Sequence, residues 1–364
     1  MTPLDYRRHV RLAREAMASA GVNQLVVHSL HNIRWLTGFG GSNARMMLGE
    51  HEAVLITDGR YEEYASGLLE QLAGHGVGEI KLLIMRTGVE QALADATLSG
   101  GAVGFEADVA TFAAYQRLST AFGVDRLQPT TGVIARARQI KDAGEIERIE
   151  ASADIADAAF AALLASLSPG QSEREVAAKL DFEMLSRGAD GLSFDTIVAS
   201  GPRSAMPHAE PSNRVLAVGD LVVFDFGAAV DGYRSDMTRT IVVGDNPSRR
   251  QQLLYDVVAA AQQAGVEAVA DGIDAAAVDS VCRELITTAG FGEHFKHGAG
   301  HSLGLEIHEA PFLSSASVDT LANNMVVTVE PGIYLPGEGG IRIEDTVLIR
   351  PGGARRLTKT SKGL

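Results

Sequence analysis

Residues 221–240, LVVFDFGAAVDGYRSDMTRT, constrain this chain most, because they set two carboxylates inside an otherwise apolar β-hairpin. The dipeptide Asp231-Gly232 suits a tight turn, since both of its residues can take positive φ. With the turn there, Asp225 and Asp236 should lie opposite or diagonal to each other on one face of the ladder. Burying two carboxylates is expensive unless positive charge compensates them, so the hairpin predicts a positively charged partner. Asp231 itself is assigned to the turn.

Length and charge limit the classes of protein to consider. A chain of 364 residues exceeds the size at which one core keeps growing, so two domains are expected. Its formal net charge of −14 argues against nucleic-acid or anionic-membrane partners, which require clustered Lys and Arg. No run approaches the ~18 apolar residues of a membrane span. The N-terminal segment also lacks the apolar core of a signal peptide, and a cytoplasmic protein is the expectation.

The single cysteine, Cys282, excludes an internal disulfide framework and suits a reducing compartment. Its helical spacing with Val278 and Leu285 favours a small buried core residue over a nucleophile.

The two expected domains meet near residue 135. Residues 24–135 alternate short apolar runs with helical patterns, which indicates a mixed α/β domain with helices packed on a sheet. Charge rises over residues 135–149, where a new alanine-rich helix begins. We therefore assign residues 1–135 to the first domain and residues 136–364 to the second.

The second domain contains an internal repeat. Residues 170–188 and 272–290 are helical segments of equal length that begin and end at Gly. Each carries a polar N-cap, Ser172 or Asp274, two residues after its first Gly. The final Gly of each suits the position after a C-cap. The repeat predicts two related helix-plus-sheet halves that face one another.

Three later segments carry charges that match the needs of the hairpin. The segment 297–308, HGAGHSLGLEIH, contains His301, and the apolar strand VVTVE ends in Glu330. In GIRIEDTVLI, strand alternation puts Arg342 and Glu344 on one face. If the four strand carboxylates converge with one histidine, their charge of about −4 matches two divalent ions better than one. The oxygen-rich donor set suits Mn, Co, Fe or Zn.

Two neighbouring patterns are assigned structural roles. Gly300-His-Ser302-Leu-Gly304 fits the G-x-S-x-G pattern of serine hydrolases, but its flanks are too polar and too short for the strand and helix that such a nucleophile elbow requires. Asp345 follows Glu344 directly, so alternation turns it to the opposite face. Arg342 has two open interpretations, an ion pair that neutralises Glu344 or a functional role.

Together these segments resemble the pita-bread metallopeptidase family, which includes methionine aminopeptidase, aminopeptidase P and prolidase. DFGAAVDGYRSDMTRT resembles its paired-Asp hairpin, HGAGHSLGLEIHEAP its histidine motif, and VEPGIY with IRIEDT its two Glu motifs. The resemblance covers nearly the whole chain, including Leu36 to Phe39. It implies an α/β (α+β) fold with a smaller creatinase-like N-terminal domain and a C-terminal pita-bread domain whose halves are related by a pseudo-twofold axis.

The resemblance implies a centre of two divalent metal ions, with Mn favoured and Co or Zn as alternatives. Asp225 would bind one ion, Asp236 and Glu344 would bridge the pair, and His301 with Glu330 would complete the other. Glu330 would also handle protons during catalysis.

Four further residues match positions that contact substrate or support the centre in this family. His308 and His208 resemble substrate and transition-state histidines, and both would be catalytic and substrate-binding. His297 and Arg342 resemble residues that line the pocket, orient ligands or bind a substrate carboxylate.

The reaction implied is removal of an N-terminal residue that precedes proline, from a proline-containing di- or oligopeptide. The first domain and the segment at Leu36 to Phe39 favour this branch over methionine aminopeptidases. Modest length and an intact Arg342 favour an Xaa-Pro dipeptidase, or prolidase, over an aminopeptidase P acting on longer peptides. A metal-free creatinase-like or non-catalytic relative is the third alternative, which would lack a complete ligand set. The resemblance also implies a homodimer.

Overall fold

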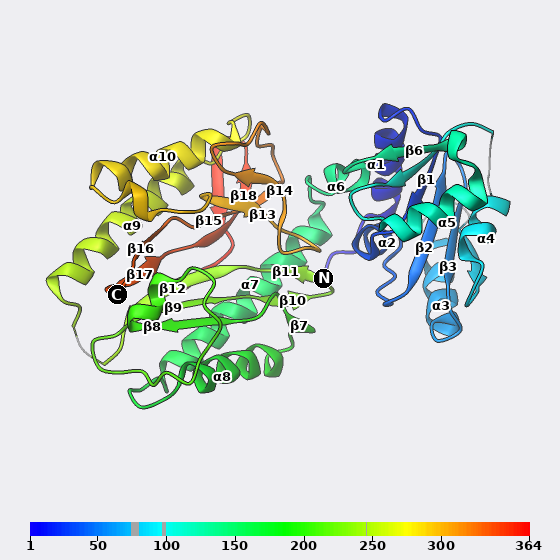
Figure 1. The fold of residues 1–364 in the computed structure, drawn as a ribbon. Coiled ribbons are helices and arrows are strands. Elements are labelled where there is room, and N and C mark those ends of the chain that lie inside the picture. Colours follow the sequence, from blue (N-terminus) through cyan, green and yellow to red (C-terminus); the bar gives the residue numbers. More distant parts are fainter. Residues whose placement is uncertain (74–79, 97–99, 245) are drawn as a thin grey trace. The chain divides into compact units, whose positions relative to one another are not determined.

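The structure is a computed structural model that separates the chain into two compact units (Figure 1). One unit spans Pro3–Arg138, and the other spans Gln139–Leu364 together with Met1–Thr2. Among the residues described, no helix has both the length and the apolar character needed to cross a membrane. The structure describes residues 1–73, 80–96, 100–244 and 246–364.

The N-terminal unit is a mixed sheet with helices, as its alternating pattern predicted. Its strands are β1 (Gln24–Val27), β2 (Ala44–Gly49), β3 (Ala53–Thr57), β4 (Ile80–Ile84), β5 (Val103–Glu106) and β6 (Leu127–Thr130). Its helices are α1 (Tyr6–Ser19), α2 (Leu30–Thr37), α3 (Glu62–Ala73), α4 (Val89–Asp95), α5 (Phe112–Phe122) and α6 (Val133–Ala137), with a 3₁₀ turn η1 (Val124–Arg126). Within the described residues the strands form one sheet in the order β4-β3-β2-β1-β5-β6. Val26, Met47 and Phe105 of the sheet pack with Leu118 and Phe122 of α5 in its core.

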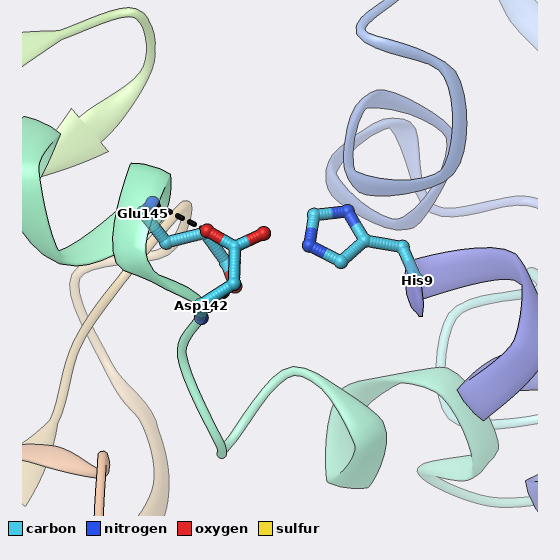
Figure 2. A group of neighbouring side chains, drawn as sticks. All are labelled: His9, Asp142 and Glu145. Carbon is cyan, nitrogen blue, oxygen red and sulfur yellow. Dashed lines mark hydrogen bonds between the residues drawn. The ribbon is translucent and has the colours of Figure 1, made fainter. Parts of the chain in front are cut away.

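Helices α1 and α2 are held together by an aromatic contact. The His9 ring, drawn in Figure 2, stacks on Trp35 with ring centroids 4.2 Å apart. Its Nδ1 lies 2.7 Å from the Trp35 carbonyl oxygen and therefore donates to it. Helix α2 ends at Gly38, whose φ of 78° is left-handed, and a Cβ there would meet the Tyr6 hydroxyl at 2.6 Å. Glycine at this turn therefore permits close packing of the two helices.

The first helix of the C-terminal unit, α7 (Ala143–Leu164), begins with two reciprocal capping hydrogen bonds. Asp142 Oδ1 accepts from the Glu145 backbone N–H at 2.8 Å, and Glu145 Oε2 accepts from the Asp142 N–H at 2.8 Å (Figure 2). This capping box satisfies two backbone donors that a helix start otherwise leaves unpaired. It fixes where α7 begins after the boundary between the units.

The first half of the C-terminal unit packs two helices on a three-stranded antiparallel sheet of order β12-β9-β8. Phe160, Leu180, Phe224 and Phe226 meet in its core. The helices are α7 (Ala143–Leu164) and α8 (Glu173–Ser186), with a 3₁₀ turn η2 (Gly201–Ala205). The strands are β7 (Gly191–Leu192), β8 (Ile197–Ser200), β9 (Leu221–Phe226), β10 (Ala228–Val230), β11 (Tyr233–Arg234) and β12 (Met237–Val242).

The second half packs two helices on a five-stranded sheet of order β14-β13-β15-β18-β19. Val258, Val278, Val327 and Val347 lie in its core with Cys282, where burial raises the pKa of the thiol to about 12. The helices are α9 (Arg249–Ala268) and α10 (Ala275–Thr288), with a 3₁₀ turn η3 (Gly292–His294). The strands are β13 (Gly300–Ser302), β14 (Glu309–Leu313), β15 (Val326–Val329), β16 (Gly332–Leu335), β17 (Gly339–Arg342), β18 (Asp345–Arg350) and β19 (Gly353–Arg356).

The two halves repeat the same local connections, which bears out the internal repeat. Helices α8 and α10 each have 14 residues, begin after Ser172 and Asp274, and are followed by left-handed Gly188 and Gly290. The backbone N–H of Gly170 donates to Leu216 O at 2.9 Å, and that of Gly272 donates to Leu321 O at 2.8 Å. One difference from the prediction is that the Asp274 side chain makes no capping hydrogen bond, whereas Ser172 does.

Candidate metal centre

The central hairpin forms as its sequence predicted. Asp231 and Gly232 have φ values of 47° and 77°, so both residues of the turn are left-handed. Asp225 pairs directly with Thr238 across strands β9 and β12, which leaves Asp236, two residues earlier, diagonal to Asp225. In an antiparallel ladder, diagonal residues of this kind share a face. Asp231 serves the turn, where its Oδ2 accepts from Arg148 Nε at 2.9 Å.

A glycine lets the two acidic strand ends approach. Gly227 separates β9 from β10, and a Cβ there would overlap the carbonyl oxygen of Ser235. No larger side chain therefore fits at 227 without moving the backbone that precedes Asp236. This close approach brings the strand ends that carry Asp225 and Asp236 together.

A cavity of about 540 Å³ in the C-terminal unit collects the charged residues. Every residue that the sequence singled out for metal, substrate or catalysis lines it, namely His208, Asp225, Asp236, His297, His301, His308, Glu330, Arg342 and Glu344. The apolar side chains of Phe194, Ile307 and Phe312 contribute other parts of the wall. The cavity thus joins a densely charged region to an apolar surface.

His301 is oriented with one ring nitrogen toward the carboxylates. Its Nδ1 lies 3.0 Å from Ser302 O, and because a carbonyl oxygen can only accept, Nδ1 carries the proton. Nε2 is then the ring nitrogen available to a metal, and it lies 3.5 Å from both Asp236 Oδ2 and Glu330 Oε1. His301, Asp236 and Glu344 each offer one ligand atom, and these atoms lie within 4.8 Å of one another. The spacing is that of a metal-binding group.

Three buried carboxylate oxygens in this cavity lack a donor. Asp225 Oδ1, Asp236 Oδ1 and Glu344 Oε1 have no hydrogen-bond partner among the residues that the structure describes. The other carboxylate oxygen of Asp225 accepts from Arg342 Nη2 at 2.5 Å, and the other oxygen of Glu344 accepts from Thr238 Oγ1 at 2.7 Å. Leaving a buried charged oxygen unpaired is costly, so a cation among these three atoms fits the chemistry of the residues.

Burial and repulsion between carboxylates raise the pKa values of Asp236 and Glu344. The pKa of Asp236 lies well above its usual range because the carboxyl is buried and Asp225 and Glu330 add negative charge beside it. Burial raises the pKa of Glu344 in the same way, and the charge of Asp236 is the next largest cause. A bound cation would oppose both shifts, because it favours the ionised carboxylates.

Arg342 pairs with Asp225 rather than with Glu344, the partner suggested by strand alternation. Its guanidinium also donates to Thr238 Oγ1 at 3.0 Å, to the Tyr334 hydroxyl at 2.8 Å and to Pro207 O at 3.2 Å. Most of its donors are therefore committed to protein atoms. These contacts favour an orienting role for Arg342 over direct binding of a substrate carboxylate.

Three further histidines line the cavity. His297 Nδ1 lies 2.8 Å from Gly298 O and so carries the proton, while Nε2 accepts from the Tyr334 hydroxyl at 2.8 Å. Burial lowers the pKa of His297, so its ring is neutral at pH 7. The His308 ring meets His301 edge to face at 4.6 Å, and burial with His301 nearby also lowers the pKa of His308. His208 and His308 are both exposed and border the cavity.

Two residues beside the centre have structural positions. Asp345 is fully buried on the other side of its strand, where Arg239 contacts it at 2.9 Å and Lys362 at 2.6 Å. This agrees with the prediction from strand alternation. Ser302 is buried within β13 and is followed by bends over residues 304–308, so the strand–turn–helix of a nucleophile elbow is absent there.

The sequence analysis missed a buried ion pair beside the histidine segment. Lys141 Nζ lies 3.0 Å from Glu309 Oε2, and their side chains are only 1% and 6% exposed. Glu309 Oε1 accepts from the Glu306 N–H at 3.1 Å, so the pair braces the segment that leads to His308. A Glu directly after His308 was the one available signal, because Lys141 lies 168 residues away from its partner.

We expect Lys141→Met to lower the free energy of unfolding by about 3–5 kcal/mol, because it removes the cation that neutralises the buried Glu309 carboxylate. The double variant Lys141→Met/Glu309→Gln should recover most of that loss. Urea denaturation measures both. The control is Arg11→Met, which breaks an exposed pair with Glu15 and should cost under ~1 kcal/mol. A double variant no more stable than Lys141→Met would contradict the pairing.

The fold and this donor set define a metallopeptidase, and comparison with known proteins agrees. Residues 147–351 match the Metallopeptidase family M24, and residues 9–140 match the Creatinase/Prolidase N-terminal domain. The chain belongs to metallopeptidase family M24. The expected class, a smaller mixed α/β domain followed by a pita-bread domain, is confirmed.

Several of the similar proteins are named as Xaa-Pro peptidases. The Xaa-Pro dipeptidase of Pyrococcus furiosus is 50% identical over 232 residues, which are 64% of this chain and 66% of that protein. A solved Xaa-Pro dipeptidase from Bacillus anthracis has a TM-score of 0.92 and 39% identity, covering 99% of both chains. A solved X-Pro aminopeptidase from Thermotoga maritima has a TM-score of 0.87 and 32% identity, covering 98% of both.

Proposed function

We propose that this protein is an Xaa-Pro dipeptidase whose centre binds two divalent metal ions. The observation that carries the metal centre is the set of three donor-less carboxylate oxygens beside the His301 Nε2 in one cavity. The dipeptidase assignment draws on the Xaa-Pro dipeptidases among the similar proteins. The proposed ligands are Asp225, Asp236, His301, Glu330 and Glu344.

Charge supports two ions rather than one. The four carboxylates carry about four negative charges, and the ion pair with Arg342 offsets one of them. One divalent ion would leave about one negative charge unmatched, whereas two would leave about one positive charge for an anionic ligand. Mn is the metal we favour, with Co or Zn as alternatives, because oxygen donors dominate the set.

Bound ions of this kind polarise a carbonyl group and lower the pKa of water. The protein's own residues supply the rest. Glu330 lines the cavity and is partly exposed there, which suits a carboxylate that takes and returns a proton. His208 and His308, at the exposed side of the cavity, are placed to donate hydrogen bonds to a substrate. His297, which burial keeps neutral, lines the wall and can contact substrate there.

Arg342 contributes by orientation in this proposal. Through Tyr334 it fixes the ring of His297, and through Thr238 it fixes the oxygen of Glu344 that does not face the cavity. Partners of this type hold ligands in place and tune their basicity.

Comparison of an Xaa-Pro dipeptide with the matching Xaa-Pro-Yaa tripeptide tests the dipeptidase assignment. After loading with Mn, Co or Zn, we expect kcat/KM to be at least about tenfold higher for the dipeptide, because a dipeptidase site must reject further chain. Better cleavage of the tripeptide would favour an aminopeptidase P, the alternative that the Thermotoga maritima structure supports. If neither peptide is cleaved with any of the three metals, the proposal is wrong.

Two expectations stay predictions. The homodimer is implied by the family resemblance, and light scattering of the purified protein tests it. A cytoplasmic location is consistent with one buried cysteine and a fold that relies on no disulfide.

A further inference from the structure

The loop that carries His208 has little regular structure of its own. It connects β8 to β9, and its regular structure is the short 3₁₀ turn η2 and a β-bridge between Val215 and Ser172. His208 lies beyond that turn, yet it borders the cavity. A histidine that contacts substrate must be held in a defined place, and loops of this kind are mobile unless their backbone is tied down.

A buried carboxylate outside the cavity holds this loop on both sides of His208. Glu173, the first residue of α8, is fully buried. At the start of the loop it accepts from Ser200 N at 2.8 Å, Ser200 Oγ at 2.7 Å and Arg203 Nε at 2.9 Å. Beyond His208 it accepts from Ser212 N at 2.9 Å and Ser212 Oγ at 2.6 Å. One side chain therefore closes the loop with five hydrogen bonds.

The charge of Glu173 suits this task. Burial alone would raise its pKa, but the hydrogen bonds from Ser212 and Ser200 outweigh burial and hold the pKa below its usual range. The carboxylate is thus ionised at neutral pH, and its position in the first turn of α8 places it at the favourable end of the helix dipole. Hydrogen bonds to an ionised acceptor are about twice as strong as neutral ones, so the bonds to Glu173 hold the loop strongly.

The same loop is also hydrogen-bonded to β17, the strand that carries Arg342. Arg203 donates through Nη2 to Glu210 O at 2.6 Å, which spans His208 from one side to the other. Arg342 donates to the carbonyl of Pro207, the residue before His208, at 3.2 Å. Ser204 Oγ accepts from the Gly340 N–H at 2.8 Å. Glu173 and the β17 strand therefore hold the loop between them.

The second half of the unit uses the same device. Asp279 on α10 is fully buried and accepts from Ala299 N at 3.0 Å and from Arg283 Nη2 at 2.9 Å. Arg283 in turn donates to His297 O at 2.8 Å. In each half, a buried carboxylate on the second helix secures the loop that brings a histidine to the cavity.

We propose that Glu173 is a positioning residue of the peptidase, which acts by holding the His208 loop at the cavity. This rests on the proposed function, in which His208 contacts substrate. Glu173 does not line the cavity and touches no group assigned to the metal.

The first test is a double-mutant cycle between Glu173→Gln and His208→Ala on the dipeptide substrate. Glu173→Gln should lower kcat/KM about tenfold or more, since small displacements of catalytic groups have effects of that size. In the His208→Ala background the same change should cost less than about twofold, because the residue it positions is gone. Equal losses in both backgrounds would overturn the proposal. Metal content should not change in any variant.

The second test does not depend on activity. Hydrogen–deuterium exchange of peptides covering residues 201–214 should speed up at least about tenfold in Glu173→Gln, while peptides of α8 keep their protection. Unchanged exchange in this loop overturns the proposal, whether or not the wild type cleaves Xaa-Pro peptides. A wild type that cleaves none of them overturns the proposed function alone.

Matched variants guard against a folding artefact. Glu175→Gln changes an exposed carboxylate on the same helix turn and should leave kcat/KM and exchange unchanged. Ser212→Ala removes one hydroxyl from the tie but keeps the backbone bond, so it should give a smaller loss in the same direction. If Glu173→Gln does not fold, the same measurements on Ser212→Ala test the proposal. Unchanged hydrogen–deuterium exchange of residues 201–214 in that variant overturns it.

Discussion

Replacing Asp236 by Asn is expected to reduce turnover by on the order of 10³-fold or more while making the metal-free protein more resistant to heat. In the proposed centre activity would fall because a neutral amide cannot supply the negative charge that a ligand shared by two ions has to provide. Stability without metal rises because Asp236 is buried next to Asp225 and Glu330, and the variant removes one of the charges that repel each other there.

The matched control lies in the same hairpin. Asp231→Asn makes the same chemical change in the turn, where φ is 47° and Asn is well tolerated, and its side chain is 55% exposed. It should keep near-normal kcat, metal content and melting temperature. Steady-state kinetics, metal analysis and calorimetry of the chelated proteins measure the three quantities. Near-normal kcat in Asp236→Asn, or a lower melting temperature of its metal-free form, would contradict the assignment.

Removing the metal is expected to abolish activity and to make folding stability depend strongly on pH. In the chelated protein the pKa values of Asp236 and Glu344 lie above their unfolded values, so the folded state binds more protons than the unfolded state. Stability must then decrease as the pH rises from the unfolded carboxyl pKa of about 4 through the raised pKa values. Metal at about a thousandfold over its Kd should restore about 4 kcal/mol.

Calorimetry of chelated and metal-loaded protein across this pH range measures the effect. The chelated protein should melt at progressively lower temperature as the pH rises, and metal should flatten the trend. The variant Asp236→Asn/Glu344→Gln, which lacks both raised carboxyls, should show the flatter trend without metal. A chelated wild type whose melting temperature rises with pH would show that these two groups do not dominate the centre.

The local parts of the site could be predicted from the sequence. The turn at Asp231-Gly232 follows from which residues tolerate positive φ, and the opposite facing of Glu344 and Asp345 follows from strand alternation. The positions of Gly188 and Gly290 after two equal helices follow from C-capping. Each of these depends on residues only a few positions apart.

Partner choice within the site could not be predicted in this way. Strand alternation suggested Glu344 as the partner of Arg342, but the guanidinium reaches Asp225, 117 residues away, because β9 and β17 approach one another in the fold. No pattern in the sequence marked Glu173 or Lys141, because the role of each depends on the distant segments that fold against it.

The sequence by itself determined which residue types sit at strand ends, turns and caps, and hence that acidic side chains would be buried on the strands of the second unit. The tertiary structure decided which of them keep an oxygen without a donor, which are neutralised by arginine, and which hold a loop in place. The physical reason is that φ preference, alternation and capping act within a few residues. The pairing of a buried charge depends instead on which distant segments the two halves bring into contact.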